Sequence, residues 1–208
     1  MKILVTAATQ EEIAPFLKWN TNIEVLICGI GIPSTVYCLT KKLLQVKYDL
    51  VIQAGIAGTF SKKIKNGDVV TVEQDVFGDI GAEEKKRFKT IFQLGFGDEN
   101  KFPFSKGCLV NTSEIFQASD LKKVKAATVN KISGRRKQTK QLKAIFDADI
   151  ESMEGAAFHF VCLQQNIQFF QLRCISNKVG ERDKTKWEIA KAIKNLNQEL
   201  IKLINSTK

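Results

Sequence analysis

The feature that most constrains the fold is a segment near the C-terminus, residues 149–177, in which a helical pattern leads directly into a strand pattern. Residues 155–165 repeat apolar side chains at helical spacing. Residues 169–175 are mostly apolar, as expected of a strand that is buried on both faces of a sheet. A helix that returns to such a strand indicates an α/β protein.

Polar residues stand at both ends of this helix and strand. Met153 and Glu154 precede the helix, and Ser176 and Asn177 follow the strand. In open α/β sheets, ligands bind outside the carboxyl ends of the strands. We therefore expect these four residues to meet at one rim, where a small molecule would bind.

The rest of the chain alternates strand and helix patterns, which implies a largely parallel central sheet. Strand patterns cover residues 2–7, 23–28, 49–53, 69–72, 107–111 and 126–129, and helix patterns cover residues 10–19, 35–46, 114–124 and 187–204. Ser34 is the predicted N-cap of the second helix. Residues 85–104 are polar and irregular, as in an insertion. With no internal repeat and no linker rich in Pro, Gly or Ser, residues 1–208 are predicted to form one domain.

The net charge of +10 raises nucleic-acid binding as an alternative function. The densest basic cluster, residues 131–143, contains no aromatic residue that could stack on bases. A solvated loop or helix face explains this cluster better, although the charge could also attract an anionic substrate.

The cysteines and the single histidine argue against a disulfide framework or a metal site. Five cysteines are scattered without CxxC spacing, which indicates reduced thiols in the cytoplasm. His159 lies in the middle of a predicted helix, where a packed role is expected, so no metal is predicted. No apolar run reaches the length of a membrane span, and the apolar run at residues 3–8 meets two glutamates at once, as a first strand would.

Two motifs carry a resemblance to a known family. Residues 152–157 (SMEGAA) followed by residues 173–177 (RCISN) resemble the nucleoside phosphorylase/nucleosidase superfamily. Within it, residues 77–83 and 187–197 are similar to the futalosine hydrolase branch of menaquinone biosynthesis. The resemblance implies a three-layer sandwich, with a mixed, largely parallel central sheet flanked by helices. It also implies a purine nucleosidase that releases hypoxanthine from futalosine without a cofactor, and a homodimer by analogy.

The resemblance also implies roles for particular residues. Glu12 matches the glutamate that activates water in nucleosidases, since a carboxylate opposite the base can deprotonate the attacking water. Glu154, with Met153, would bind the ribose hydroxyls. The remaining predicted contacts to substrate are the Val129 main chain, Gly55, Ser176 and Phe77. As isolated features, Glu12 and Glu154 could be acidic residues at helix N-termini, and Val129 could be an ordinary buried strand residue. The position of Glu12 after a strand and the motif around Glu154 favour the functional roles.

Asn177 departs from the aspartate that adenine-specific nucleosidases carry at this position. An amide offers a donor beside an acceptor, which suits O6 and protonated N7 of a 6-oxopurine. An ionised aspartate at this position would place a carboxylate oxygen against O6, and neither atom could donate a hydrogen bond to the other. Hypoxanthine or guanine is therefore the expected leaving base, with Asn177 stabilising it, and the departure leaves no obvious general acid.

Alternatives remain open at the level of the sequence. Gly29 and Gly31 follow a strand, but without a third glycine they are a weak dinucleotide signal, and a tight turn fits them equally well. The loops at residues 7–12 and 55–59 contain no arginine to bind phosphate, so water is the favoured nucleophile. The competing functions are a nucleosidase or phosphorylase acting on methylthioadenosine, adenosylhomocysteine or inosine, and a non-catalytic basic protein that binds nucleic acid.

Overall fold

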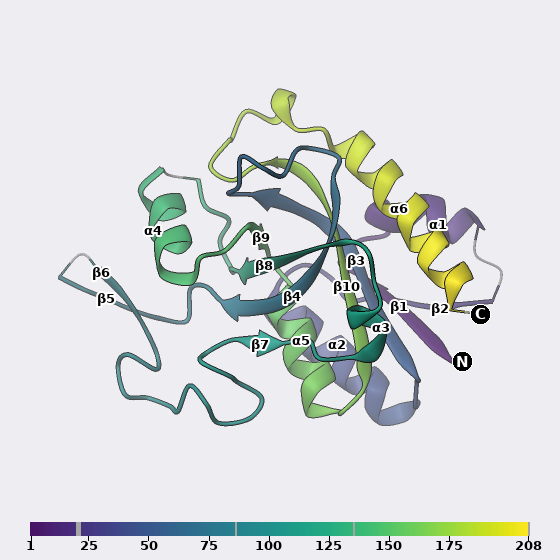
Figure 1. Cartoon of the computed structure of the whole chain (residues 1–208), viewed down its shortest axis with the longest axis horizontal. Helices are drawn as coiled ribbons and strands as arrows, with labels where there is room; N and C mark the ends of the chain where they lie inside the picture. The colour runs from purple at the N-terminus through teal and green to yellow at the C-terminus, as the bar shows by residue number, and fades with distance from the viewer. Residues whose placement is uncertain (20–21, 86, 135, 208) are drawn as a thin grey trace.

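The computed structural model describes residues 1–19, 22–85, 87–134 and 136–207. Within these residues, eight strands form one mixed sheet with helices around it, and two more strands form a hairpin at its edge (Figure 1). The strands of the sheet are β1 (Ile3–Ala7), β2 (Glu24–Ile27), β3 (Leu50–Thr59), β4 (Val69–Phe77), β7 (Leu109–Val110), β8 (Lys122–Thr128), β9 (Ile150–Ser152) and β10 (Gln168–Lys178), and the hairpin is β5 (Gly81–Glu84) and β6 (Arg87–Thr90). The helices are α1 (Ala14–Trp19), α2 (Ile32–Gln45), α3 (Glu114–Gln117), α4 (Arg136–Phe146), α5 (Gly155–Gln164) and α6 (Ile189–Ser206), with 3-10 turns at Glu11–Ile13 and Lys184–Lys186.

The predicted α/β fold with a mixed, largely parallel sheet is confirmed, but the sheet closes on itself instead of lying flat in a three-layer sandwich. β3 pairs with β10, β10 with β4, β4 with β8, β8 with β9, and β9 returns to β3. β1 and β2 extend from the first half of β3. The long β3 makes closure possible, because its first half pairs with β1 and its second half with β9.

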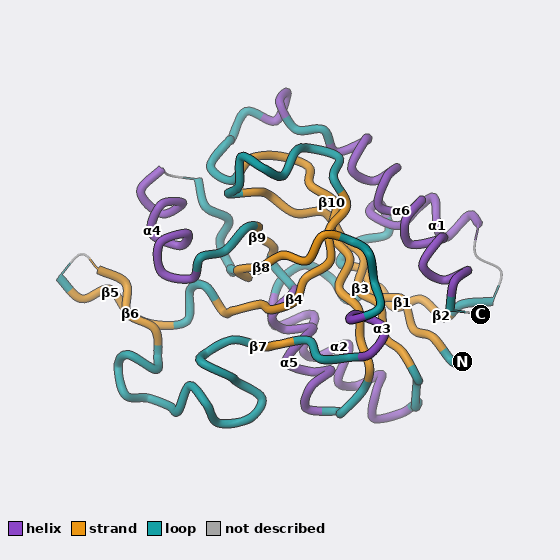
Figure 2. The backbone as a smooth tube through the Cα atoms, viewed as in Figure 1, coloured by secondary structure: helices purple, strands orange, loops and turns teal. Residues whose placement is uncertain are grey.

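The closed sheet buries apolar residues against two pairs of helices (Figure 2). In β1, Ile3 and Val5 face the cluster beneath α1 and α6, whereas Leu4 faces the cluster beneath α2 and α5. This alternation follows from the two-residue period of a strand. Both faces of the sheet are therefore covered, and the loops at the strand ends are left to form a site.

Tertiary pairing moved several predicted boundaries. The third strand does not stop at Gln53 but runs on to Thr59, because its glycine-rich second half pairs with β9 and β10. Within residues 114–124, predicted as helix, only Glu114–Gln117 is helical. Lys122 already begins β8, where pairing with β4 overrides helix propensity.

Two further local predictions were corrected. The N-cap of α2 is Gly31, with a φ of 89°, so Ser34 lies inside the helix instead of capping it. The segment at residues 85–104 is not wholly irregular, since β6 pairs with β5 in the hairpin; residue 86 lies outside the described residues.

The basic cluster and the histidine are placed as expected. Within the basic cluster at residues 131–143, residues 137–143 lie on α4 and their lysine side chains are exposed to solvent; residue 135 lies outside the described residues. His159 is fully buried in α5, and its Nδ1 lies 3.0 Å from the Leu109 carbonyl oxygen. Burial lowers the pKa of His159 to about 4, so the ring packs as a neutral side chain. No helix in the described part of the chain is long and apolar enough to cross a membrane.

Candidate active site

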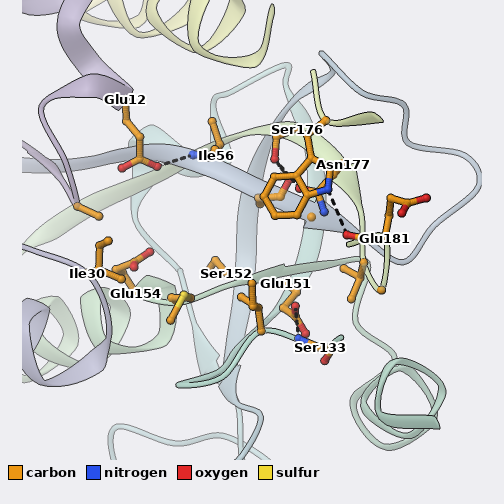
Figure 3. A pocket seen from close by; sticks show the side chains of 18 of the residues that line it. Glu12, Ile30, Ile56, Ser133, Glu151, Ser152, Glu154, Ser176, Asn177 and Glu181 are labelled. Atoms are coloured by element: carbon orange, nitrogen blue, oxygen red, sulfur yellow. Dashed lines mark hydrogen bonds between the residues drawn. The ribbon is translucent and has the colours of Figure 1, made fainter. Parts of the chain in front are cut away.

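A cavity of about 350 Å³ opens where β3, β9 and β10 end and the chain leaves β1 (Figure 3). Five of the predicted site residues line it: Glu12, Met153, Glu154, Ser176 and Asn177. The other lining residues come from β3, from β9 and from the loops that follow β1, β2, β8 and β10: Ala8, Thr9, Ile30, Ile56, Ala57, Gly58, Ile132, Ser133, Glu151, Ser152, Val179, Gly180, Glu181, Arg182 and Trp187. Segments far apart in sequence thus meet at one rim, as predicted.

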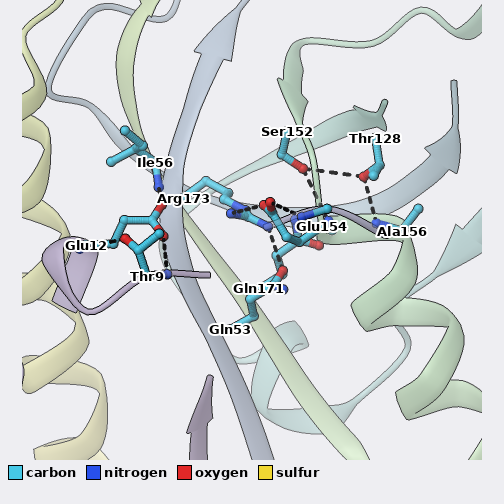
Figure 4. A network of polar contacts seen from close by, with 12 residues as sticks. Thr9, Glu12, Gln53, Ile56, Thr128, Ser152, Glu154, Ala156, Gln171 and Arg173 are labelled. Atoms are coloured by element: carbon cyan, nitrogen blue, oxygen red, sulfur yellow. Dashed lines mark hydrogen bonds and ion pairs between the residues drawn. The ribbon is translucent and has the colours of Figure 1, made fainter. Parts of the chain in front are cut away.

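Glu12 is held in place by backbone donors from two segments. Its Oε1 accepts a hydrogen bond from the Ile56 N–H at 3.0 Å, and its Oε2 accepts one from the Thr9 N–H at 3.2 Å (Figure 4). Burial raises the pKa of Glu12, while the Ile56 bond and the Arg173 charge oppose that rise. A fixed carboxylate with a raised pKa, next to a cavity, is suited to act as a general base.

Glu154 lies across the cavity from Glu12 and is fixed by a charge and a backbone donor. Its Oε1 accepts a hydrogen bond from the Gly31 N–H at 3.1 Å, and its Oε2 lies 3.7 Å from Nη1 of Arg173 (Figure 4). Arg173 is 1% exposed and also donates to Oε1 of Gln53 at 2.6 Å. Of the two glycines after β2, Gly31 therefore binds Glu154, whereas the Gly29 N–H donates to the Ala8 carbonyl oxygen at 3.1 Å.

Gly55 does not line the cavity but leaves room for the charged groups beside it. A Cβ at this position would lie 3.1 Å from Oε1 of Glu12 and would collide with the guanidinium of Arg173. Gly55 was predicted to contact the substrate; in the structure, its missing side chain instead lets Glu12 and Arg173 approach the backbone closely.

Asn177 stands at an irregularity of β10, where the register shifts between Ile175 and Asn177. Its Oδ1 accepts a hydrogen bond from the Ser176 hydroxyl at 2.7 Å, and its Nδ2 donates to the Lys178 carbonyl at 3.0 Å. An amide oxygen has a second lone pair and an amide NH₂ a second hydrogen, so both atoms keep one position for a ligand. Figure 3 shows the side chains of Ser176 and Asn177 at the cavity.

The structure does not bring Val129 and Phe77 to this cavity. The Val129 N–H donates a hydrogen bond to the Ser152 carbonyl oxygen at 3.0 Å. Val129 also lines a separate hollow together with Leu142. Phe77 lines a third hollow with Phe104. Phe77 is the last residue of β4, and Val129 directly follows β8.

Sequence reasoning missed several residues that build the site. Arg173 was noted only as part of a motif, although a cation inside an otherwise apolar strand pattern is a signal of a buried ion pair. Glu151 and Ser133 also line the cavity, and the Ser133 N–H donates to Oε1 of Glu151 at 3.0 Å. Trp187 closes the cavity from the loop before α6 and donates its indole N–H to the Glu181 carbonyl at 3.1 Å.

The sequence profile of the Phosphorylase superfamily matches residues 2–206. The chain belongs to this superfamily. The resemblance carried by the SMEGAA and RCISN motifs is thereby confirmed, and so is the nucleosidase type of fold.

Individual superfamily members narrow the comparison. The chain is 28% identical to the futalosine hydrolase of Thermus thermophilus, over 91% of this chain and 86% of that protein. It is 26% identical to the aminodeoxyfutalosine nucleosidase of Campylobacter jejuni, over 88% of each chain. The solved structure of futalosine hydrolase from Helicobacter pylori superimposes with a TM-score of 0.82 at 21% identity, covering 99% of this chain and 98% of that one.

Proposed function

We propose that this superfamily member is a purine nucleosidase that hydrolyses the N-glycosidic bond of futalosine, releasing hypoxanthine and leaving dehypoxanthine futalosine for menaquinone synthesis. The observation that carries the proposal is that Glu12, Glu154 and Asn177 line one cavity of nucleoside size. The similarity to futalosine hydrolases over most of the chain supports this choice of substrate.

The geometry supports separate roles for Glu12, Glu154 and Asn177 around the sugar and the base. Cleavage passes through a transition state that resembles an oxocarbenium ion. Glu12 orients a water and takes its proton as the water oxygen bonds to C1′, while the C1′–N9 electron pair leaves with the purine. Glu154 accepts hydrogen bonds from the ribose hydroxyls, and these strengthen as positive charge grows on the ring. The Asn177 amide binds O6 and N7 of the departing base.

The charges at the cavity favour water over phosphate as the nucleophile. Four carboxylates line it, those of Glu12, Glu151, Glu154 and Glu181. Among the described lining residues, Arg182 is the only cation, and its side chain is exposed. Arg173 lies behind the cavity and already pairs with Glu154. A phosphate anion would meet net repulsion here, whereas a neutral water would not.

The decisive experiment is product analysis with purified protein. Incubation with futalosine is expected to release hypoxanthine at a rate that does not depend on phosphate. Inosine, methylthioadenosine and adenosylhomocysteine, each tested with and without phosphate, provide the comparison. Release of base that requires phosphate and yields a ribose 1-phosphate would contradict hydrolysis, and faster release from any of the other nucleosides would reassign the substrate.

We also propose that residues 1–208 act as a single domain in the cytoplasm and assemble as a homodimer. The five cysteines are free thiols, which suits a reducing compartment. Tyr37 and Leu44 of α2 are 66% and 71% exposed and line one shallow, mainly apolar hollow on that helix. The mass in solution, measured by light scattering, tests the dimer, and Leu44→Glu should then yield a monomer.

A further inference from the structure

Glu151 is the one buried carboxylate at the cavity, within the described residues, to which the proposed mechanism gives no task. It lies on β9, is only 6% exposed and lines the cavity directly. A buried polar atom without a hydrogen-bond partner is costly, so the unpartnered oxygen of a carboxylate at a ligand site calls for an explanation in terms of a ligand.

The strand register sets Glu151 opposite Asn177. Gly58 of β3 pairs with Glu151 of β9 on one side and with Asn177 of β10 on the other. All three residues line the cavity. Since neighbouring strands lie about 4.8 Å apart, the two polar residues are separated by roughly 10 Å across a glycine that has no side chain. This row therefore places a hydrogen-bonding side chain on each side of a glycine that leaves space between them.

The carboxylate of Glu151 is oriented so that one oxygen remains for a ligand. Oε1 accepts the Ser133 N–H at 3.0 Å (Figure 3). Oε2 is buried and has no hydrogen-bond partner among the described residues. Burial raises the pKa of Glu151, and the Ser133 bond opposes the rise. Glu151 therefore keeps one oxygen without a protein donor, on a side chain that lines the cavity.

We propose that Glu151 is a specificity residue that accepts the N1–H of a 6-oxopurine through Oε2, while Asn177 binds the opposite edge of the same base. Hypoxanthine and guanine carry a hydrogen at N1, whereas adenine has a lone pair there. An adenine base would set acceptor against acceptor in a buried site, which costs more than a missing contact. The inference rests on the proposed function only in that the bound base is a purine.

The variant Glu151→Gln tests this role with little change of shape. The Ser133 N–H can donate only to the oxygen of the new amide, which therefore takes the Oε1 position. The NH₂ group then takes the Oε2 position, which is proposed to contact the base. Loss of a hydrogen bond to a charged acceptor predicts a fall of about 10- to 150-fold in kcat/KM for futalosine. The ratio of activity on futalosine to activity on aminodeoxyfutalosine should fall further, because an NH₂ donor suits the unprotonated N1 of adenine.

A binding measurement at pH 7.5 separates this proposal from the choice of nucleoside. Calorimetry should show wild-type protein binding hypoxanthine more tightly than 1-methylhypoxanthine or adenine, and Glu151→Gln should lose that preference. Glu188→Gln, a change in an exposed carboxylate that pairs with Lys191 at 2.7 Å, should keep it.

The outcomes distinguish the two hypotheses. A preference for hypoxanthine that depends on Glu151, in a protein that fails to hydrolyse futalosine, would support the role of Glu151 and reject the substrate. Equal losses on both nucleosides, with the base preference unchanged, would show that Glu151 only anchors Ser133 and would overturn the inference. Ratios between two ligands are insensitive to the folded fraction, so partial misfolding of the variant does not obscure the result.

Discussion

Glu154 and Arg173 form a buried ion pair in which both side chains are at least nine-tenths inaccessible to solvent and the Oε2–Nη1 distance is 3.7 Å. The pair links a carboxylate at the cavity to the interior of the sheet. Because the guanidinium also donates to Gln53, its position is fixed by the core and not by the ligand. Glu154 is thereby held at the cavity before a ligand arrives, as its proposed role toward the ribose requires.

Removing one partner of this pair should destabilise the protein strongly. Arg173→Met would leave Glu154 as an uncompensated buried charge, which typically costs about 3–5 kcal/mol. Lys202→Met breaks an exposed pair with Glu199 and should cost about 0–1 kcal/mol. Urea denaturation gives both free energies of unfolding, and similar values for the two variants would contradict the structural role of Arg173.

The pH profile should report Glu12 as a base. A general base works in its deprotonated form, so kcat/KM should decline as the pH falls through the pKa of Glu12. Because burial raises this pKa, the acid limb should lie above the ordinary range of a glutamate. Glu12→Gln should abolish turnover yet retain binding of hypoxanthine. Turnover near the wild-type rate in this variant would remove Glu12 from the mechanism.

Asn177→Asp should weaken activity on 6-oxopurine nucleosides. The Ser176 hydroxyl can still donate to the new carboxylate, but the donor that faced O6 is lost and an acceptor replaces it. An acceptor facing an acceptor costs about 1–3 kcal/mol, or roughly 5- to 150-fold in kcat/KM. Steady-state kinetics with inosine and adenosine analogues would check the shift, and an unchanged preference would refute the role of Asn177.

Gly55→Ala should reduce catalysis by displacing two charged side chains. The added methyl group would collide with the Arg173 guanidinium and press on Glu12. Displacing a catalytic group by about 1 Å can cost up to 100-fold, so we expect a loss of at least about tenfold in kcat. Gly97→Ala is the control, because its Cβ would meet only the Phe92 ring at 3.6 Å. Equal activity in the two variants would show that the site tolerates a side chain at Gly55.

Asp75 should make folding pH-dependent in the opposite sense to a salt-bridged acid. Complete burial raises its pKa from 3.8 to about 7. Between these values the folded state binds a proton that the unfolded state has released, so stability falls as the pH rises through this window. Asp75→Asn should remove this contribution, making the stability at pH 7.5 relative to pH 4.5 higher than in wild type. Asp98→Asn, at an exposed position, should follow the wild-type curve, and a parallel curve for Asp75→Asn would disprove the assignment.

Local patterns were sufficient to identify the central helix and strand of the site. The apolar spacing in residues 155–165 matches α5, and the apolar run at residues 169–175 lies within β10. The polar tips of these elements, Glu154 and Asn177, do meet at one cavity. These features depend on short-range periodicity and on the general position of ligands at strand ends, both of which are written in contiguous residues.

Residues without a local signal were missed or misplaced. No sequence pattern predicts that Glu151 and Asn177 lie on either side of Gly58. This arrangement arises because β9 and β10 pair separately with β3 at Gly58. Phe77 and Val129 stand near family motifs, yet their strands end beside other hollows. The sequence cannot indicate which rim a strand end will join when the sheet curves.

The amino-acid sequence by itself determined the α/β class, the superfamily and the rim at which the cavity opens, because periodic apolar residues and short motifs encode them in short contiguous segments. The tertiary structure alone decided that the sheet closes, that Arg173 supports Glu154, and that Glu151 and Asn177 flank one glycine. Those relationships join residues far apart in the sequence; Arg173 and Gln53, which hold the ion pair in place, are 120 positions apart. They are fixed by strand pairing and by the need to neutralise buried charge, which no contiguous segment can show.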